Sequence, residues 1–250
     1  MIDEYLIKVS ACWALFYMLY FLLLRKETFF QENRIYLLFS LLVSLVFPFL
    51  PLGGVGSGLL PEAFLPAINI NAEAVVNVEK SAANLLAWGY WIGVSFMGLR
   101  FLLSLWKLDQ IRSASTVSYT SGIREVRSDL VESPFSFFRT LYLPVDMVEN
   151  DEAYRQIITH ERVHIQEFHS LDLILAELLA IFFWFNPFIF WYKKSIQHIH
   201  EYLADEAVLR VANRKHYHQT LLEQAVPGLS LGHHFSQSQL KNRFDMMKRV

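Results

Sequence analysis

The chain has 250 residues, of which 54% are hydrophobic and only 18% charged, against about 25% charged in an average soluble domain. A formal net charge of -2 gives no basic excess of the kind that marks nucleic-acid binding, so no direct nucleic-acid ligand is expected. The single cysteine, Cys12, cannot close an internal disulfide or build a cysteine-based zinc site. The composition therefore argues against an ordinary soluble enzyme.

Three apolar stretches approach or exceed the length that a membrane span requires, which is about 20 residues for a hydrocarbon core of roughly 30 Å. They are residues 5–24, 35–52 and 85–106. The first is too long for a signal-peptide core and has one charge, Lys8, near its start. The third is interrupted only by Arg100, which is close enough to its end for the side chain to reach water. Residues 1–108 are thus predicted to form a transmembrane region.

The links between these stretches predict their orientation, because cytoplasmic loops carry an excess of Lys and Arg. The first link contains Arg25, Lys26 and Arg34, whereas the loop over residues 53–84 contains one lysine beside three glutamates. The first link is therefore expected inside the cell and the loop 53–84 outside. The chain that follows the third span is then expected on the cytoplasmic side.

Beyond residue 108 the sequence becomes polar, and short β-like pieces with turn residues between them predict a small sheet. The pieces are residues 116–119, 123–126 and 140–143. Asn150 and Asp151 then offer an N-cap for a helix over about 151–169. We assign residues 109–250 to a second domain that contains both this sheet and this helix.

The predicted helix contains an HExxH pattern that begins at His160 and ends at His164. Residues four apart lie one above the other on an α-helix, so both imidazoles can point at one metal ion while Glu161 reaches a water on that ion. Such a geometry suits zinc. A catalytic zinc usually takes three protein ligands and leaves one position for water, so a third ligand is expected further along the chain.

Glu201 is the candidate third ligand, in the stretch His200-Glu201-Tyr202-Leu203-Ala204-Asp205. Asp205 lies four residues later, and on a helix its carboxylate can accept the outer ring N–H of one ligand histidine and fix the tautomer of that ring. His200 is the alternative third ligand, because it differs from Glu201 by only about 100° of helix rotation.

Another histidine lies between the two motifs. His169 is expected to form a local hydrogen-bonded pair with Asp172 rather than to bind the metal.

Both motifs, together with a Trp-Phe-Asn-Pro stretch at 184–187 and a Ser-Pro-Phe stretch that begins at Ser133, resemble the BlaR/MecR family of membrane zinc metallopeptidases. The resemblance covers nearly the whole chain. It implies that His160, His164 and Glu201 bind the zinc and that Glu161 is the general base. Members of the family respond to an outside signal, such as a β-lactam, by cleaving themselves and provoking loss of a transcriptional repressor.

The details of the second motif are more similar to the branch of this family found in Bacteroidetes-type bacteria than to the β-lactam receptors proper. Those receptors carry a penicillin-binding sensor domain after a last span, whereas this chain stops at Val250 with neither. We therefore expect a C-terminal sensor part to be absent from this chain, and we infer no antibiotic sensing. The basic end of the chain, which includes Arg243 and Arg249, is interpreted as juxtamembrane.

A further apolar run, residues 171–192, lies between the two halves of the predicted site. If it crossed the bilayer, Glu201 would lie about 30 Å from His160, whereas zinc bonds are about 2 Å long. Pro187 interrupts the run and removes a backbone hydrogen bond. We therefore expect a re-entrant or domain-buried hairpin that returns the chain to the side from which it came.

Taken together, the sequence predicts a mainly α-helical, multi-pass protein of the bacterial inner membrane with a zincin-like metallopeptidase domain facing the cytoplasm. The predicted activity is zinc-dependent hydrolysis of a protein substrate, which is the chain itself or a cytoplasmic regulator such as a transcriptional repressor. The predicted partners are the lipid bilayer and that substrate. The alternative is a non-catalytic receptor or scaffold in which one zinc ion is structural.

Overall fold

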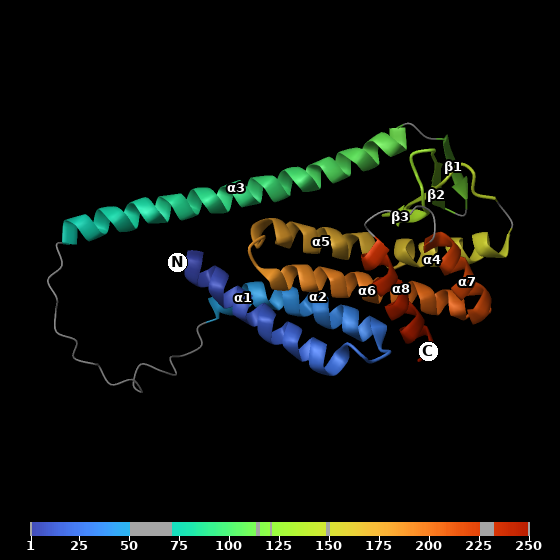
Figure 1. The fold of residues 1–250 in the computed structure, drawn as a ribbon, viewed down its shortest axis with the longest axis horizontal. Helices are drawn as coiled ribbons and strands as arrows, with labels where there is room; N and C mark the ends of the chain where they lie inside the picture. The colour runs from blue at the N-terminus through green and yellow to red at the C-terminus, as the bar shows by residue number, and fades with distance from the viewer. Residues whose placement is uncertain are drawn as a thin grey trace.

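The computed structural model describes residues 2–50, 72–113, 116–120, 122–148, 151–225 and 233–249. The described chain is mostly helical, with one small sheet near one end (Figure 1). The helices are α1 (Ile2–Leu19), α2 (Phe30–Val46), α3 (Ala72–Ser113), α4 (Glu152–Gln166), α5 (His169–Phe182), α6 (Pro187–Leu209), α7 (Arg214–Ala225) and α8 (His233–Met247). Residues 53–71 of the predicted outer loop, and Asn150, lie outside the described residues.

Three helical stretches have the length and apolar composition of membrane spans, as the sequence predicts. They are Glu4–Leu24, Phe30–Phe49 and Leu85–Ser113. The first ends in a π-helical turn (Tyr20–Leu24) and the second in a 3-10 turn (Phe47–Phe49) that contains Pro48. The second begins at Phe30 rather than at residue 35, because the polar side chains of Asn33 and Arg34 find partners inside the fold.

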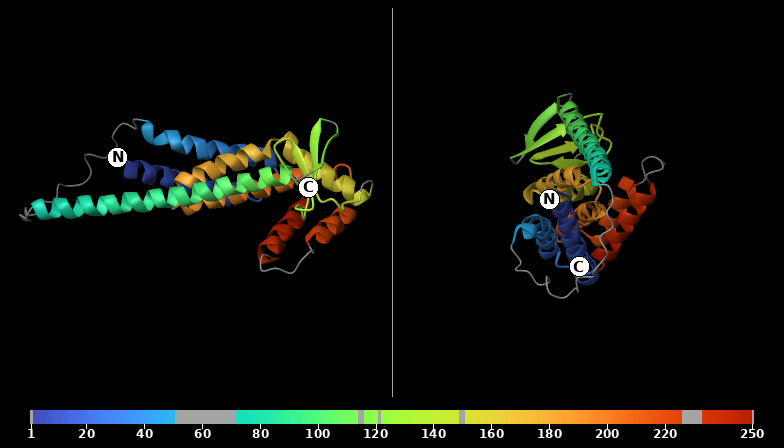
Figure 2. Two further views of the ribbon diagram at one scale, coloured as in Figure 1. Left: turned by 90° about the horizontal axis from the view of Figure 1, so that it is seen from above. Right: turned by 90° about the vertical axis from the view of Figure 1, so that its left-hand side faces the viewer.

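The third span lies in the long helix α3, which runs alongside the remaining helices and leads towards the sheet (Figure 2). At Gly93 it comes so close to the hairpin that an added Cβ would collide with the indole of Trp184. Arg100, which the sequence predicts to reach water, has a side chain that is 54% exposed and lies 3.7 Å from the Glu177 carboxylate on α5. Helix α3 is therefore attached to the bundle through α5 and the turn that follows it.

The small sheet has four strands in the order β1-β2-β4-β3. They are β1 (Thr116–Thr120), β2 (Ile123–Arg127), β3 (Phe135–Phe137) and β4 (Thr140–Leu143). Strands β1 and β2 form an antiparallel hairpin at Gly122, whose φ of 77° favours glycine. Strand β4 pairs parallel to β2 and antiparallel to β3. The three predicted strands are confirmed, and the edge strand β3, which was not predicted, packs against α4.

Helix α4 carries the HExxH pattern. Its N-cap is Asp151, whose carboxylate accepts a hydrogen bond of 2.6 Å from the backbone N–H of Glu152. The helix ends at Gln166, earlier than predicted, because Phe168 adopts the left-handed conformation with φ at 55°. The chain turns there, and α5 begins at the next residue.

Helices α5 and α6 form the hairpin that the sequence predicts. Asn186 caps α6 by accepting a 2.9 Å hydrogen bond from the backbone N–H of Phe188, and Pro187 occupies the first helical position. Figure 1 shows the turn between the two helices at the end of the bundle where α1 begins, whereas α4 lies at the opposite end. The hairpin therefore leaves from the region of α4 and returns to it.

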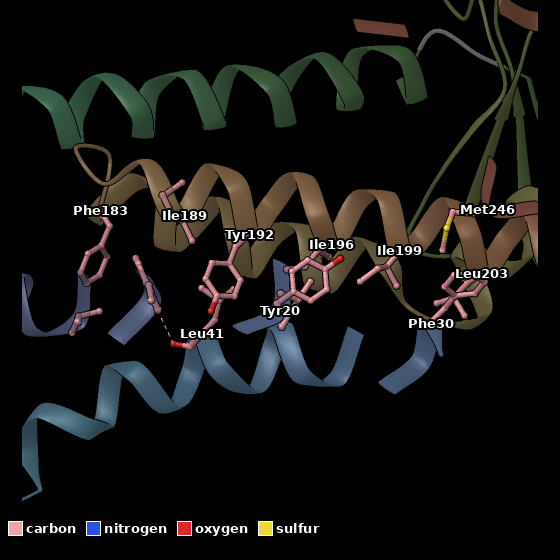
Figure 3. Packing of buried hydrophobic residues seen from close by; sticks show 14 residues of the cluster. Tyr20, Phe30, Leu41, Phe183, Ile189, Tyr192, Ile196, Ile199, Leu203 and Met246 are labelled. Carbon is pink, nitrogen blue, oxygen red and sulfur yellow. Dashed lines mark hydrogen bonds between the residues drawn. The ribbon is translucent and has the colours of Figure 1, made fainter. Parts of the chain in front are cut away.

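The main core lies between α6 and the first two spans (Figure 3). Ile189, Tyr192 and Ile196 of α6 are completely buried and face α1 and α2. The Tyr192 hydroxyl also lies 3.0 Å from Ser40 Oγ of α2. At the far end of α6, helices α7 and α8 cover Val208 in a smaller cluster. Helix α6 is thus packed on several sides and contacts α4.

Candidate metal centre

Helix α4 and the C-terminal half of α6 bring three side chains to one point. His160 Nε2 lies 3.2 Å from His164 Nε2 and 3.5 Å from Glu201 Oε2. His164 Nε2 lies 3.7 Å from Glu201 Oε1. Glu201 rather than His200 therefore joins the two imidazoles, and the ligand atoms of this trio all lie within 4.8 Å of one another.

These spacings fit a zinc ion. Zinc bonds to imidazole nitrogen and carboxylate oxygen are about 2.0–2.2 Å long, so the ligand atoms of a tetrahedral site lie about 3.3–3.6 Å apart. The observed separations of 3.2, 3.5 and 3.7 Å bracket that range. Two imidazoles and one carboxylate are also a donor set typical of catalytic zinc. The trio can therefore hold a zinc ion without a large rearrangement.

The outer nitrogen of His160 is held by Tyr217 of α7. The Tyr217 hydroxyl lies 2.9 Å from His160 Nδ1 and donates a 2.7 Å hydrogen bond to Asp205 Oδ1. Because this hydroxyl donates its proton to Asp205, it accepts from His160 Nδ1–H, which leaves the Nε2 lone pair free for a metal. Asp205 itself is 3.4 Å from His160 Nδ1. The role that the sequence gives to Asp205 is therefore shared with Tyr217.

Arg243 of α8 closes the same side of the site. Its Nε donates a 2.9 Å hydrogen bond to Asp205 Oδ2, and its Nη1 lies 3.0 Å from Glu201 Oε2. Only 16% of the Arg243 side chain is exposed. Arg243, which the sequence places in the basic end of the chain, therefore has its guanidinium buried between two carboxylates.

The charges within the trio depend on these neighbours. Burial disfavours the protonated form of His160, but hydrogen bonds to Asp205 and Glu201 raise its pKa to about 9. Burial and the neighbouring His160 lower the pKa of His164 to about 3. Burial also opposes charge on Glu201, yet the His160 bond and Arg243 keep the pKa of this carboxyl well below its usual range. A cation therefore meets a carboxylate and one neutral imidazole, and it displaces one proton from His160.

Glu161 lies beside the trio, on helix α4, which also carries His160 and His164. Burial raises the pKa of its carboxyl above the usual value, although the nearby His160 and a hydrogen bond from Ser136 act in the opposite direction. Ser136 belongs to the edge strand β3. A carboxyl group whose pKa lies closer to neutrality can both take up and release a proton.

The outer nitrogen of the second histidine contacts another histidine. His164 Nδ1 lies 2.7 Å from His169 Nδ1, and the His169 ring stacks on the His200 ring at a centroid distance of 3.8 Å. His200 Nε2 in turn lies 2.8 Å from Asp172 Oδ2. The expected pairing of His169 with Asp172 is therefore wrong, because Asp172 bonds His200 and Arg34 instead.

The fold and site together define a class of protein. A set of membrane-spanning helices joined to an HExxH helix, with a glutamate from a later helix beside both histidines, is the arrangement typical of membrane zinc metallopeptidases. Comparison with protein families gives the particular family. Residues 99–247 match the model described as BlaR1 peptidase M56. Because this match covers more than half of the chain, the protein belongs to the BlaR1 peptidase M56 family.

Individual relatives carry the corresponding names. The chain is 32% identical over 126 residues to the methicillin resistance protein mecR1 of Staphylococcus aureus, a match that covers 48% of this chain and 20% of that protein. It is 24% identical over 222 residues to the regulatory protein BlaR1 of Bacillus licheniformis, which covers 70% of this chain and 37% of that protein. The matched regions thus make up well under half the length of either relative.

Membership of this family, together with the three apolar helices, identifies a membrane protein related to the mecR1 and BlaR1 proteins. The family also implies a metal. The trio formed by His160, His164 and Glu201 provides a place for it.

Proposed function

We propose that this protein is a membrane-embedded, zinc-dependent endopeptidase that cleaves a protein substrate in signal transduction. The observation that carries the proposal is the near-tetrahedral spacing of the His160, His164 and Glu201 ligand atoms, which come from two separate helices. In this proposal residues 1–108 form the membrane region, and residues 109–250 form the peptidase domain.

The proposed mechanism assigns a task to each side chain of the site. A bound zinc ion would lower the pKa of a coordinated water to about 7 and polarise the substrate carbonyl. Glu161 takes the proton from the attacking water and delivers it to the leaving amine, for which its raised pKa is suited. Asp205 acts with Tyr217 to keep His160 in the tautomer that presents Nε2 to the metal.

The position of strand β3 supports a peptide as substrate. It is at the edge of the described sheet, and its Ser136 bonds the Glu161 carboxylate. An extended substrate segment that added to this edge by backbone hydrogen bonds would lie directly beside the proposed general base. Such binding uses main-chain hydrogen bonds, which a segment of any sequence can form. It is therefore suited to segments of a protein, including segments of the chain itself.

The positive-inside rule supports a cytoplasmic location for the site. The link between α1 and α2 is rich in basic residues, and Arg34 from this end of α2 bonds Glu167, three residues after His164. Arg249, close to the end of α8, donates a 2.9 Å hydrogen bond to the Lys26 carbonyl in the same link. We therefore propose that the substrate is a cytoplasmic protein, such as a transcriptional repressor, or the enzyme itself.

The test compares Glu161→Gln and Glu201→Gln with the wild type in membranes, by zinc content and by mass spectrometry of new peptide ends. Glu223→Gln, an exposed substitution on α7, is the matched control. We expect both site variants to lose cleavage, whereas Glu161→Gln keeps its zinc and Glu201→Gln loses it. If the wild type and Glu161→Gln yield the same fragments, the chain is a receptor or scaffold with a structural metal.

A further inference from the structure

Arg34 connects the second membrane span to the helix that carries both histidines. Its Nη2 donates a 2.6 Å hydrogen bond to the backbone carbonyl of Glu167, and its Nη1 lies 3.0 Å from the Glu167 carboxylate. Its Nε donates a 2.7 Å hydrogen bond to Asp172 on α5. One guanidinium thus holds the residue that caps the C-terminus of α4 and the first turn of α5.

The contact between Arg34 and Asp172 is a buried ion pair rather than a surface one, whereas the Glu167 side chain is 41% exposed. Only 12% of the Arg34 side chain and 11% of the Asp172 side chain are exposed. Gln31, one turn before Arg34, adds a 3.1 Å hydrogen bond to the same Glu167 carboxylate. Arginine suits this place because its planar fork can serve several acceptors at once, which the ammonium of lysine cannot do in the same geometry.

A path of contacts leads from Arg34 to the metal centre. Asp172, held by Arg34, lies 2.8 Å from His200 Nε2. The His200 ring stacks on His169, whose Nδ1 lies 2.7 Å from the outer nitrogen of His164. A shorter path runs through Glu167, which is the C-cap of α4 and lies three residues after His164. Groups that hold the outer nitrogen of a ligand histidine govern both its orientation and its affinity for metal.

We infer that Arg34 is a positioning residue of the metal centre: it fixes His164 to transmembrane helix α2, so that a displacement of α2 relative to α4 changes the geometry of the site. The inference rests on the proposed function, because it assumes that His164 binds the metal. This connection gives the site a means of regulation, since His164 lies on α4, outside the candidate membrane spans, whereas Arg34 lies within one of them.

The test uses Co²⁺ as a spectroscopic probe of the full chain purified in detergent. The visible absorption of Co²⁺ reports the geometry of its ligands, and its titration gives the affinity. We expect Arg34→Gln to weaken Co²⁺ binding about tenfold, the low end of the range for residues behind a metal ligand, and to alter the spectrum at saturation. Arg25→Gln, an exposed arginine at the end of the first span, is the control and is expected to behave as the wild type.

Two further variants keep the inference testable if Arg34→Gln does not fold, as judged by circular dichroism. Asp172→Asn and Glu167→Gln each remove the negative charge of one partner of the guanidinium and are expected to change the spectrum in the same direction. Combining Asp172→Asn with Arg34→Gln should add less than the sum of the two single effects, because both act on one path.

Two results would overturn the inference, and they are distinguishable. A wild-type spectrum and affinity in Arg34→Gln, or in both other variants where Arg34→Gln is unfolded, refutes the positioning role alone. Absence of Co²⁺ binding by the wild type refutes the proposed metal site and the inference with it.

Discussion

Replacing Tyr217 with phenylalanine removes a single oxygen atom, the hydroxyl oxygen next to His160 Nδ1. That oxygen lies 2.9 Å from His160 Nδ1 and donates a 2.7 Å hydrogen bond to Asp205. The ring itself is almost fully buried, so the aromatic packing against Val208 and Leu221 should survive the change. The substitution therefore tests the hydrogen bonds and leaves the fold in place.

The expected magnitude follows from what remains after the change. A hydrogen bond to a charged group contributes about 1.5–3 kcal/mol, and about 1.4 kcal/mol corresponds to a factor of ten in affinity. Asp205 keeps its bond to Arg243, and its Oδ1, 3.4 Å from His160 Nδ1, can move to accept the ring N–H directly. Part of the loss is thus recovered, and we expect zinc affinity to fall about tenfold.

The second variant, Asp205→Asn, is expected to reduce zinc affinity more than Tyr217→Phe does. It removes the carboxylate that orients Tyr217 and leaves the buried Arg243 guanidinium with one carboxylate fewer. We expect a loss of about a hundredfold in zinc affinity, the upper end of the range for such partners.

The assay for both variants is competition for zinc against a chelator of known affinity. Tyr119→Phe, on an exposed tyrosine of β1, is the matched control. An affinity of Tyr217→Phe equal to that of the wild type, or a smaller loss in Asp205→Asn than in Tyr217→Phe, would refute the reasoning.

Two further predictions concern pH and the attachment of α3. Because the pKa of His160 is raised to about 9 and zinc must displace its proton, zinc affinity should rise about tenfold per pH unit between pH 6 and 8, and a pH-independent affinity would contradict this. Gly93→Leu places a side chain against the indole of Trp184, so we expect thermal unfolding in detergent at a lower temperature, whereas Gly98→Leu, which has open space, should have no such effect.

The parts of the site that the sequence reveals are those that repeat along one helix. The HExxH spacing and the four-residue interval from Glu201 to Asp205 follow directly from the helical period. The hairpin could also be inferred, because a zinc bond of about 2 Å cannot bridge a membrane of about 30 Å. Both inferences depend on local spacing or on a single distance.

The remaining contacts depend on tertiary packing that local spacing does not encode. Tyr217, Arg243 and Arg34 reach the site or its supports from three other helices, and nothing in the residues around them distinguishes them from surface or membrane-flanking side chains. The early end of α4 was missed for a related reason. It depends on Phe168 in a left-handed conformation, which residues with large side chains seldom adopt.

X-ray absorption spectroscopy of the zinc-loaded full chain tests the joint binding of one ion by two helices most directly. The account predicts one zinc per chain, coordinated by two imidazole nitrogens and by oxygen at about 2.0–2.2 Å. It also predicts that His164→Ala loses one of the two imidazole ligands. A zinc ion coordinated by sulfur, or one whose spectrum is the same in the wild type and in His164→Ala, would contradict it.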